Sequence, residues 1–218
     1  MNLTWPTVTQ LAASVQAPPG YDYALPTAAD VPRLARAVAG WFPGLAAGNA
    51  GCFLRENFYN GQVCLDGCTE GDYFVLLLRR KQEWVGMLAV ERDRDSQVLY
   101  GRVGAVAAHH RGVGLSRTFP PLMEAMGRSM GMGMVYSLCT LKQPQMQRCF
   151  EQSHWQLAGI MPGFDREEIE PGTVMRVFEA LYVKVLVPQA ELLTPQAHGM
   201  TTGTRTLYEL LYAGGAGH

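Results

Sequence analysis

The sequence has no long apolar run and no marked excess of charge of either sign. No stretch of about 18 consecutive apolar residues occurs, so no transmembrane helix is expected. The net charge is −1 and there is no basic run, which argues against a nucleic-acid partner and against electrostatic attachment to a membrane. The start, Met1-Asn2-Leu3-Thr4, lacks the charged residues and apolar core of a signal peptide.

Cysteine is scarce and odd in number. Of the five cysteines, Cys139 and Cys149 lie in apolar or helical contexts, which predicts a reducing, cytoplasmic compartment. The spacing of Cys64 and Cys68 would suit a metal pair, but no second Cys/His pair has the matching spacing. No bound metal is therefore expected.

Apolar residues, by contrast, make up 48% of the 218 residues, enough for a sizeable core in one domain. We expect an N-terminal arm at 1–20, a domain at 21–187, and a C-terminal extension at 188–218 that carries an amphipathic helix at 204–212. A helix outside the core needs a surface to pack on, either its own domain or a partner chain, so a homodimer remains open.

Residues 103–116 organise the chain. A small, β-branched run leads through His109 and His110 into Arg111-Gly112-x-Gly114-x-Ser116, and apolar residues at helical spacing follow. A strand, a glycine-rich turn and a helix together form a site for an anion. The spacing matches neither the dinucleotide fingerprint G-x-G-x-x-G nor the Gly-Lys-Ser/Thr of a P-loop. The two histidines are expected on the loop surface.

Periodicity and turn residues predict strands and helices in an α/β order. A short strand at 21–26 precedes a helix at 27–42, and a helix at 144–152 follows the loop region. Further strands are expected at 73–78, 84–91, 97–107, 134–141, 156–161 and 175–187, with a charged excursion at 165–171. Pro120-Pro121 means that the helix after the loop is either kinked or begins near Thr118 with both prolines in its first turn.

The loop Arg111-x-x-Gly114-x-Ser116, with Val106 ending the strand before it, resembles the acyl-CoA pyrophosphate loop of the GNAT superfamily of N-acetyltransferases. The order of elements from about Tyr21 to Val187 is similar as well. The resemblance implies an α/β (α+β) GNAT fold, a mixed central sheet of about six to seven strands splayed at the acyl-CoA site and flanked by helices. It implies acetyl-CoA as co-substrate, with these cofactor-binding residues: Val106, Ala107, Arg111, Gly112, Val113, Gly114, Leu115, Ser116, Gln143 and Phe150.

The stretch 143–155 resembles the family's second motif in spacing more than in identity. Phe150 stands where the family often has a tyrosine that protonates the departing CoA thiolate, and it has no hydroxyl. The proton would then come from a water, Tyr136 or the thiol of Cys149.

The resemblance also leaves the general base open. Tyr100 stands where several family members have a glutamate, and a tyrosine is a poor base at neutral pH, although it could hold a relaying water. Glu91, on the neighbouring strand, is the nearest carboxylate, or else a solvated charge at a strand end. Tyr100, Glu91 and Tyr136 are the candidate catalytic residues.

Three residues are candidates for binding the acceptor. Arg102 is either a clamp for a substrate carboxylate or a surface arginine paired with Asp93 or Asp95. Phe58 and Tyr59 either face the acceptor or pack on the sheet. The predicted reaction is direct acyl transfer from acyl-CoA to a primary amine of a small molecule or peptide. The alternative is a non-catalytic acyl-CoA-binding or regulatory module on the same fold.

Overall fold

The computed structural model describes residues 3–67 and 70–212. Cys68, one member of the candidate metal pair, lies outside the described residues. The chain divides into two compact units, Met1–Leu186 and Val187–His218. No helix among the described residues is long and apolar enough to cross a membrane.

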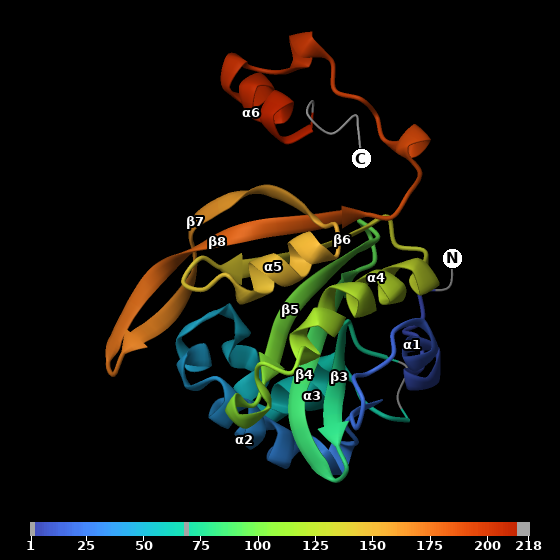
Figure 1. Ribbon diagram of the computed structural model, residues 1–218, viewed down its shortest axis with the longest axis vertical. Coiled ribbons are helices and arrows are strands. Elements are labelled where there is room, and N and C mark those ends of the chain that lie inside the picture. The colour runs from blue at the N-terminus through green and yellow to red at the C-terminus, as the bar shows by residue number, and fades with distance from the viewer. Residues whose placement is uncertain (1–2, 68–69, 213–218) are drawn as a thin grey trace. The chain divides into compact units, whose positions relative to one another are not determined.

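A twisted mixed sheet forms the centre of the first unit (Figure 1). Its order is β1-β3-β4-β5-β6-β8-β7, with β2 paired in parallel to β3. The pair β5–β6 is also parallel, and every other pair is antiparallel. The strands are β1 (Asp22–Ala24), β2 (Val63–Cys64), β3 (Tyr73–Arg80), β4 (Glu83–Asp93), β5 (Val98–Val106), β6 (Met134–Thr140), β7 (Gln156–Glu170) and β8 (Thr173–Val185).

Five helices cover the two faces of this sheet, and each face has its own core. The helices are α1 (Val8–Ser14), α2 (Val31–Trp41), α3 (Glu56–Gln62), α4 (Phe119–Met130) and α5 (Gln145–Gln152). Phe74, Leu76 and Leu78 of β3 belong to the core under α1, α4 and α5, whereas Val75 and Leu77 belong to the core under α2 and α3. The uninterrupted apolar sequence of β3 is thus explained by burial on both faces, as expected.

Residues 3–20 include a helix and buried side chains. Thr7 and Gln10 form a capping box that starts α1. Trp5 and Leu11 are buried in the core, and the Trp5 indole N–H donates to the carbonyl of Gly71 at 2.9 Å. Residues 3–20 therefore contribute to the domain core and do not stand apart from it as an arm.

The two prolines that follow the loop lie in the first turn of α4. A 3-10 turn at Leu115–Thr118 comes first, Thr118 is the N-cap of α4, and Pro120-Pro121 follow where their missing N–H groups have no helical partner to lose. Gly131 ends the helix in the left-handed conformation. The second of the two sequence alternatives is confirmed.

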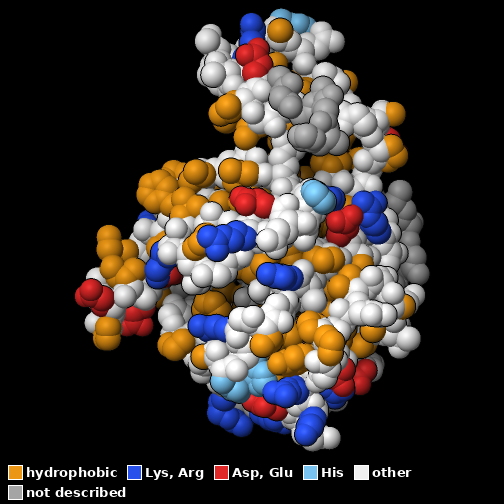
Figure 2. All heavy atoms as spheres, in the orientation of Figure 1, with side chains coloured by type: hydrophobic (Ala, Val, Ile, Leu, Met, Phe, Trp, Pro, Cys, Tyr) orange, Lys and Arg blue, Asp and Glu red, His pale blue; other side chains and the backbone are white. Residues whose placement is uncertain are grey.

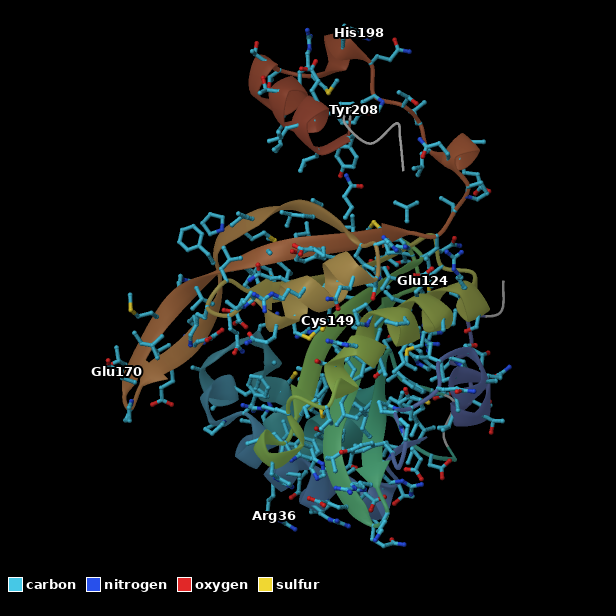
Figure 3. The ribbon with its side chains drawn as sticks, in the orientation of Figure 1. Arg36, Glu124, Cys149, Glu170, His198 and Tyr208 are labelled. Atoms are coloured by element: carbon cyan, nitrogen blue, oxygen red, sulfur yellow. The ribbon has the colours of Figure 1, made fainter. Side chains whose placement is uncertain are left out.

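The charged segment 165–171 is not an excursion from the sheet. It continues β7, which pairs with β8 as far as Glu170↔Thr173 and forms a long hairpin with Glu170 at its tip (Figure 3). Hydrophobic side chains gather on the outer surface of this hairpin (Figure 2), among them Ile160, Met175 and Phe178. The polar residues of β7 form backbone hydrogen bonds with β8, and the periodicity of the sequence does not predict this pairing.

The second unit contains the predicted amphipathic helix as α6 (Thr202–Tyr212). Within it the rings of Tyr208 and Tyr212 stack, with centroids 5.2 Å apart. Leu207 and Leu210 of the same helix are exposed.

Candidate active site

The parallel strands β5 and β6 separate halfway along their length. Their register runs from Val98↔Met134 to Gly101↔Ser137 and ends there. The hydroxyl of Ser137 donates to the carbonyl oxygen of Gly101 at 2.9 Å, so it closes the paired part. Beyond it the sheet is splayed, as the resemblance implied.

A cavity of about 470 Å³ occupies this gap. Phe119 and Met123 of α4 and Met146 and Phe150 of α5 line it from one side of the sheet. From the other side it is lined by residues of the 42–50 loops and of β7, namely Phe42, Gly44, Leu45, Gly48, Ala50 and Asp165 to Glu168. Because lining residues come from both faces, the cavity crosses the sheet where the strands separate.

Gly101 and Gly104 of β5 line the cavity. A Cβ at Gly104 would meet the ring of Phe119 at 2.7 Å, and one at Gly101 would collide with the sulfur of Met123. Because these glycines have no side chain, Phe119 and Met123 of α4 can pack against the sheet.

The loop after β5 presents unused N–H groups. Gly112 and Gly114 have φ angles of 83° and 87°, which only glycine adopts readily. The backbone N–H groups of Gly112, Val113 and Gly114 make no hydrogen bond among the residues that the structure describes. Val113 is exposed, so the N–H groups next to it can be reached from solvent. This arrangement suits an anion such as a pyrophosphate.

Arg111 braces the loop from inside. Its Nε donates to the carbonyl of Val106 at 3.0 Å and one terminal nitrogen donates to the carbonyl of Trp41 at 3.1 Å. The guanidinium also lies over the ring of Phe42. It joins the end of β5 to the end of α2, so in this structure the Arg111 side chain supports the loop backbone and is not presented to an anion.

Val106 and Ala107 are both expected cofactor-binding residues, but the backbone N–H group of Ala107 already has a hydrogen-bond partner. Ala107 donates its N–H to the carbonyl of Val85 at 2.8 Å. Since N–H groups alternate along a strand, those of Val106 and Gly104 point to the opposite edge, where β6 has separated. Val106 and Gly104 are thus available and Ala107 is not.

The other expected cofactor residues divide between loop and cavity. Leu115 is buried in the core, and the Ser116 hydroxyl lies 3.8 Å from the thiol of Cys149 on α5 (Figure 3). Gln143 and Phe150 line the cavity. Phe150 is buried and stacks on Tyr182, with ring centroids 5.1 Å apart.

Arg102 lies at an irregularity of β5 where the register with β4 shifts between Ala89 and Val90. One terminal nitrogen lies 2.5 Å from the carboxylate of Glu91, and the other donates to the backbone and side chain of Asn49. Burial is the main influence on the guanidinium, yet Glu91 and nearby tyrosines keep its pKa above the ordinary value. Its partner is neither Asp93 nor Asp95, and its guanidinium is not free to clamp a substrate carboxylate.

The candidate catalytic residues do not line the cavity. Tyr100 and Tyr136 stack on each other with centroids 4.6 Å apart, and burial raises the pKa of both hydroxyls. Glu91 is held by Arg102. A phenol with a raised pKa is even less ionised at neutral pH than an ordinary tyrosine, and Tyr100 does not line the cavity, so neither observation supports it as the base or as the holder of a relaying water.

Phe58 and Tyr59 have packing roles. Tyr59 is fully buried and its hydroxyl donates to the carbonyl of Phe53 at 2.9 Å. Phe58 packs edge-to-face on Phe53 and Tyr73. Neither lines the cavity, so the second of the two sequence alternatives, packing on the sheet, holds for both.

Sequence reasoning missed Glu179. It is on β8 opposite Thr140, lines the cavity and is only 8% exposed. Its carboxyl group makes no hydrogen bond or ion pair among the described residues. Burial raises its pKa to about 7, and repulsion from Asp165 and Glu167 adds to the effect. The available signal was one carboxylate inside the apolar run 177–183.

Asp165 holds the opposite wall of the cavity. One of its carboxylate oxygens accepts the backbone N–H groups of Asn49 and Arg166, both at 2.7 Å. Asn49 in turn contacts Arg102. β5, the loop at 49 and β7 are therefore joined around the cavity by polar contacts that begin at Arg102 and end at Asp165.

Comparison with solved structures identifies the fold. Similar structures include a ribosomal L7/L12 α-N-protein acetyltransferase in complex with coenzyme A, with a TM-score of 0.62 and 13% identity, covering 79% of this chain and 97% of that one. A GNAT-family acetyltransferase from Streptococcus pneumoniae has a TM-score of 0.58 and 11% identity, with 77% and 99% covered. The ribosomal-protein-S5-alanine acetyltransferase from Vibrio fischeri has a TM-score of 0.58 and 10% identity, with 78% and 96% covered.

The chain therefore has the GNAT fold, as expected from the sequence. No family model matches the chain, and no curated protein matches it.

Proposed function

We propose that this protein transfers an acyl group, most simply acetyl, from acyl-CoA to a primary amine in the cavity between β5 and β6, with Glu179 as the general base. The observation that carries the proposal is a buried, unpaired carboxyl group with a pKa of about 7 in a cavity that crosses the sheet. A base is most effective when its pKa lies near the working pH.

CoA would be bound by backbone N–H groups more than by side chains. The N–H groups of Gly112, Val113 and Gly114 suit the pyrophosphate. Pantetheine would follow the free edge of β5, where the N–H groups of Gly104 and Val106 suit the thioester carbonyl. The helix dipole contributes less than in a loop that runs directly into a helix, because the 3-10 turn Leu115–Thr118 intervenes.

The acceptor would enter from the opposite face, which the 42–50 loops and β7 line. Its neutral nitrogen attacks the thioester carbon, the C–N bond forms, the C–S bond breaks, and Glu179 takes the proton that the nitrogen loses. The departing thiolate takes a proton from solvent and leaves as CoA, and Glu179 releases its proton to solvent. An amine that arrives as ammonium first gives one more proton to solvent.

Charged residues of both signs line this side of the cavity. The acidic ones are Asp165, Glu167, Glu168 and Glu179, and the basic ones are Arg102, Lys142 and Arg166. Lys142 pairs with Glu167 at 2.6 Å and Arg102 pairs with Glu91, so the charge of the lining does not by itself select a cationic acceptor. Two neighbours are named as acetyltransferases of ribosomal proteins, so peptides with a free N-terminus belong in a screen beside small amines.

The test is release of CoA thiol from acetyl-CoA in the presence of a panel of primary amines and free N-terminal peptides. Acceptor-dependent release, with the acetylated amine seen by mass spectrometry, is expected. Binding of acetyl-CoA without turnover of any acceptor would favour the non-catalytic alternative and overturn the proposed reaction.

A further inference from the structure

A second polar cluster lies outside the cavity, where the β3–β4 hairpin meets the start of the cofactor loop. Glu83 begins β4, and His109 and His110 form the 3-10 turn Ala108–His110 that follows β5. One oxygen of Glu83 lies 2.7 Å from His109 Nε2 and the other lies 3.5 Å from His110 Nε2. A ligand atom from each of the three residues lies within 4.8 Å of the others.

The two histidines are not equivalent. His109 is exposed, whereas His110 is only 5% exposed, which corrects the expectation that both lie on the loop surface. Burial of a histidine with both ring nitrogens in contact with polar groups fixes its orientation. In tetrahedral coordination with metal–ligand bonds of about 2.0–2.1 Å, ligand atoms are roughly 3.4 Å apart, and the spacings in this cluster bracket that value.

We propose that Glu83, His109 and His110 form a binding site for a divalent transition metal, with Zn²⁺ as the best-matched ion. Two imidazoles and one carboxylate are ligands that Zn²⁺ prefers, whereas Mg²⁺ and Ca²⁺ favour oxygen ligands throughout. Three protein ligands leave one position for water. Although the sequence alone gave no reason to expect a metal, the fold brings Glu83 next to two histidines 26 and 27 residues later.

Tyr21 contacts the ring nitrogen of His110 that faces away from Glu83. Its hydroxyl lies 3.0 Å from His110 Nδ1, and the two rings meet edge-on. When His110 Nδ1–H donates to the Tyr21 oxygen, Nε2 carries the lone pair and faces Glu83. Metal-binding histidines almost always have such a partner on the nitrogen that does not bind the metal.

The position of the site indicates what a bound metal would do. None of the three residues lines the cavity, so the ion would not reach the reacting groups. His110 directly precedes Arg111, whose side chain braces the loop with the unused N–H groups. A metal would join the start of β4 to the first turn of that loop and restrict its motion. This inference does not depend on the proposed reaction.

The experiment is calorimetric titration of chelator-treated protein with ZnCl₂, followed by Co²⁺ absorption spectroscopy. Wild type is expected to bind one equivalent, and the Co²⁺ spectrum should have d–d bands without a thiolate charge-transfer band, since the ligands are nitrogen and oxygen. Glu83→Gln and His109→Ala each remove one exposed ligand and should weaken binding by about tenfold or more. Glu56→Gln and His198→Ala, which change exposed residues elsewhere, should bind as wild type does.

Hydrogen exchange gives the second measurement. Zn²⁺ should slow exchange in peptides that cover 108–116 in wild type and not in His109→Ala. Absence of stoichiometric binding, equal binding by all four variants, or a thiolate band in the Co²⁺ spectrum would each overturn the proposal.

Discussion

Replacing Glu179 by Gln tests the chemistry of the site most sharply. Gln has nearly the same volume and cannot accept the proton, so it removes the base without opening a cavity. General bases contribute about 10²–10⁴-fold to rate, and kcat for Glu179→Gln should fall by that factor. KM for acetyl-CoA should change little, because Glu179 is on β8 whereas the proposed pyrophosphate loop follows β5.

The pH dependence of activity and of stability follows from the raised pKa of Glu179. Glu179 acts as a base only when ionised, so wild-type kcat/KM should rise with pH through about 7 and this step should be missing in the variant. The stability of the fold changes with pH in the opposite direction to kcat/KM. Because the folded state holds this proton more tightly than the unfolded chain, wild type is most stable below 4.5 with respect to this group and loses stability as pH rises to about 7.

The cost of ionising Glu179 in the fold can be worked out from the same values. The pKa of Glu179 rises from 4.5 to about 7 in the fold, and this difference corresponds to at most about 3 kcal/mol of folding free energy lost when the group ionises. Gln does not ionise, so Glu179→Gln should unfold at higher denaturant concentration than wild type at pH 8 and similarly at pH 4. A variant that is less active yet more stable at pH 8 cannot owe its loss of activity to unfolding.

The assay measures CoA thiol release with an acceptor found in the amine panel, between pH 5.5 and 9, with Glu170→Gln at the hairpin tip as matched control. Carboxyl ¹³C NMR needs no acceptor: one resonance should titrate near pH 7 in wild type and be absent from Glu179→Gln. Full activity in the variant, or no carboxyl that titrates near neutral pH, would refute the assignment of Glu179 as base.

Two further predictions concern the walls of the cavity. Glu167→Gln removes a negative charge that raises the pKa of Glu179 and frees Lys142 from its ion pair, so the midpoint of the pH–rate profile should move to lower pH; an unchanged or higher midpoint would contradict this. Gly104→Ala forces a methyl group against the ring of Phe119 and should cost about 1–3 kcal/mol in denaturant unfolding. Gly61→Ala, where a Cβ meets nothing within 4 Å, is the control and should not destabilise; equal losses in both would show that contact with Phe119 is not the cause.

Local sequence signals determined most of the architecture. Apolar β3, the prolines at the start of α4 and Gly131 at its end each report a local physical constraint, and each element lies where it was expected. The loop at 111–116 could be recognised for the same reason, since glycine conformation and the order strand, turn, helix are local. The sequence leaves the exact start of α4 between two alternatives, and the expectation that the segment 165–171 leaves the sheet is wrong.

The parts that could not be predicted depend on pairing between distant residues. Glu179 differs from other carboxylates of the chain because β8 places it at the gap between two other strands, where it has no hydrogen-bond or ion-pair partner among the described residues. The pairs Arg102–Glu91 and Arg102–Asn49 likewise require the register of β4 and the position of the loop at 49. The assumption that catalytic residues would sit at the family's usual positions led to Tyr100, which stacks on Tyr136 and does not line the cavity.

The central claim is that the glycine loop and the gap beside β5 form an acyl-CoA site. The most direct test is calorimetric titration with acetyl-CoA of wild type, Gly114→Val and the control Gly172→Val, whose glycine has a similar φ at the hairpin turn. Wild type and Gly172→Val should bind alike. Gly114→Val should bind at least about tenfold more weakly, because each hydrogen bond from an N–H group to a charged phosphate is worth about 1.5–3 kcal/mol. No binding by wild type, or equal weakening in both variants, would contradict the account.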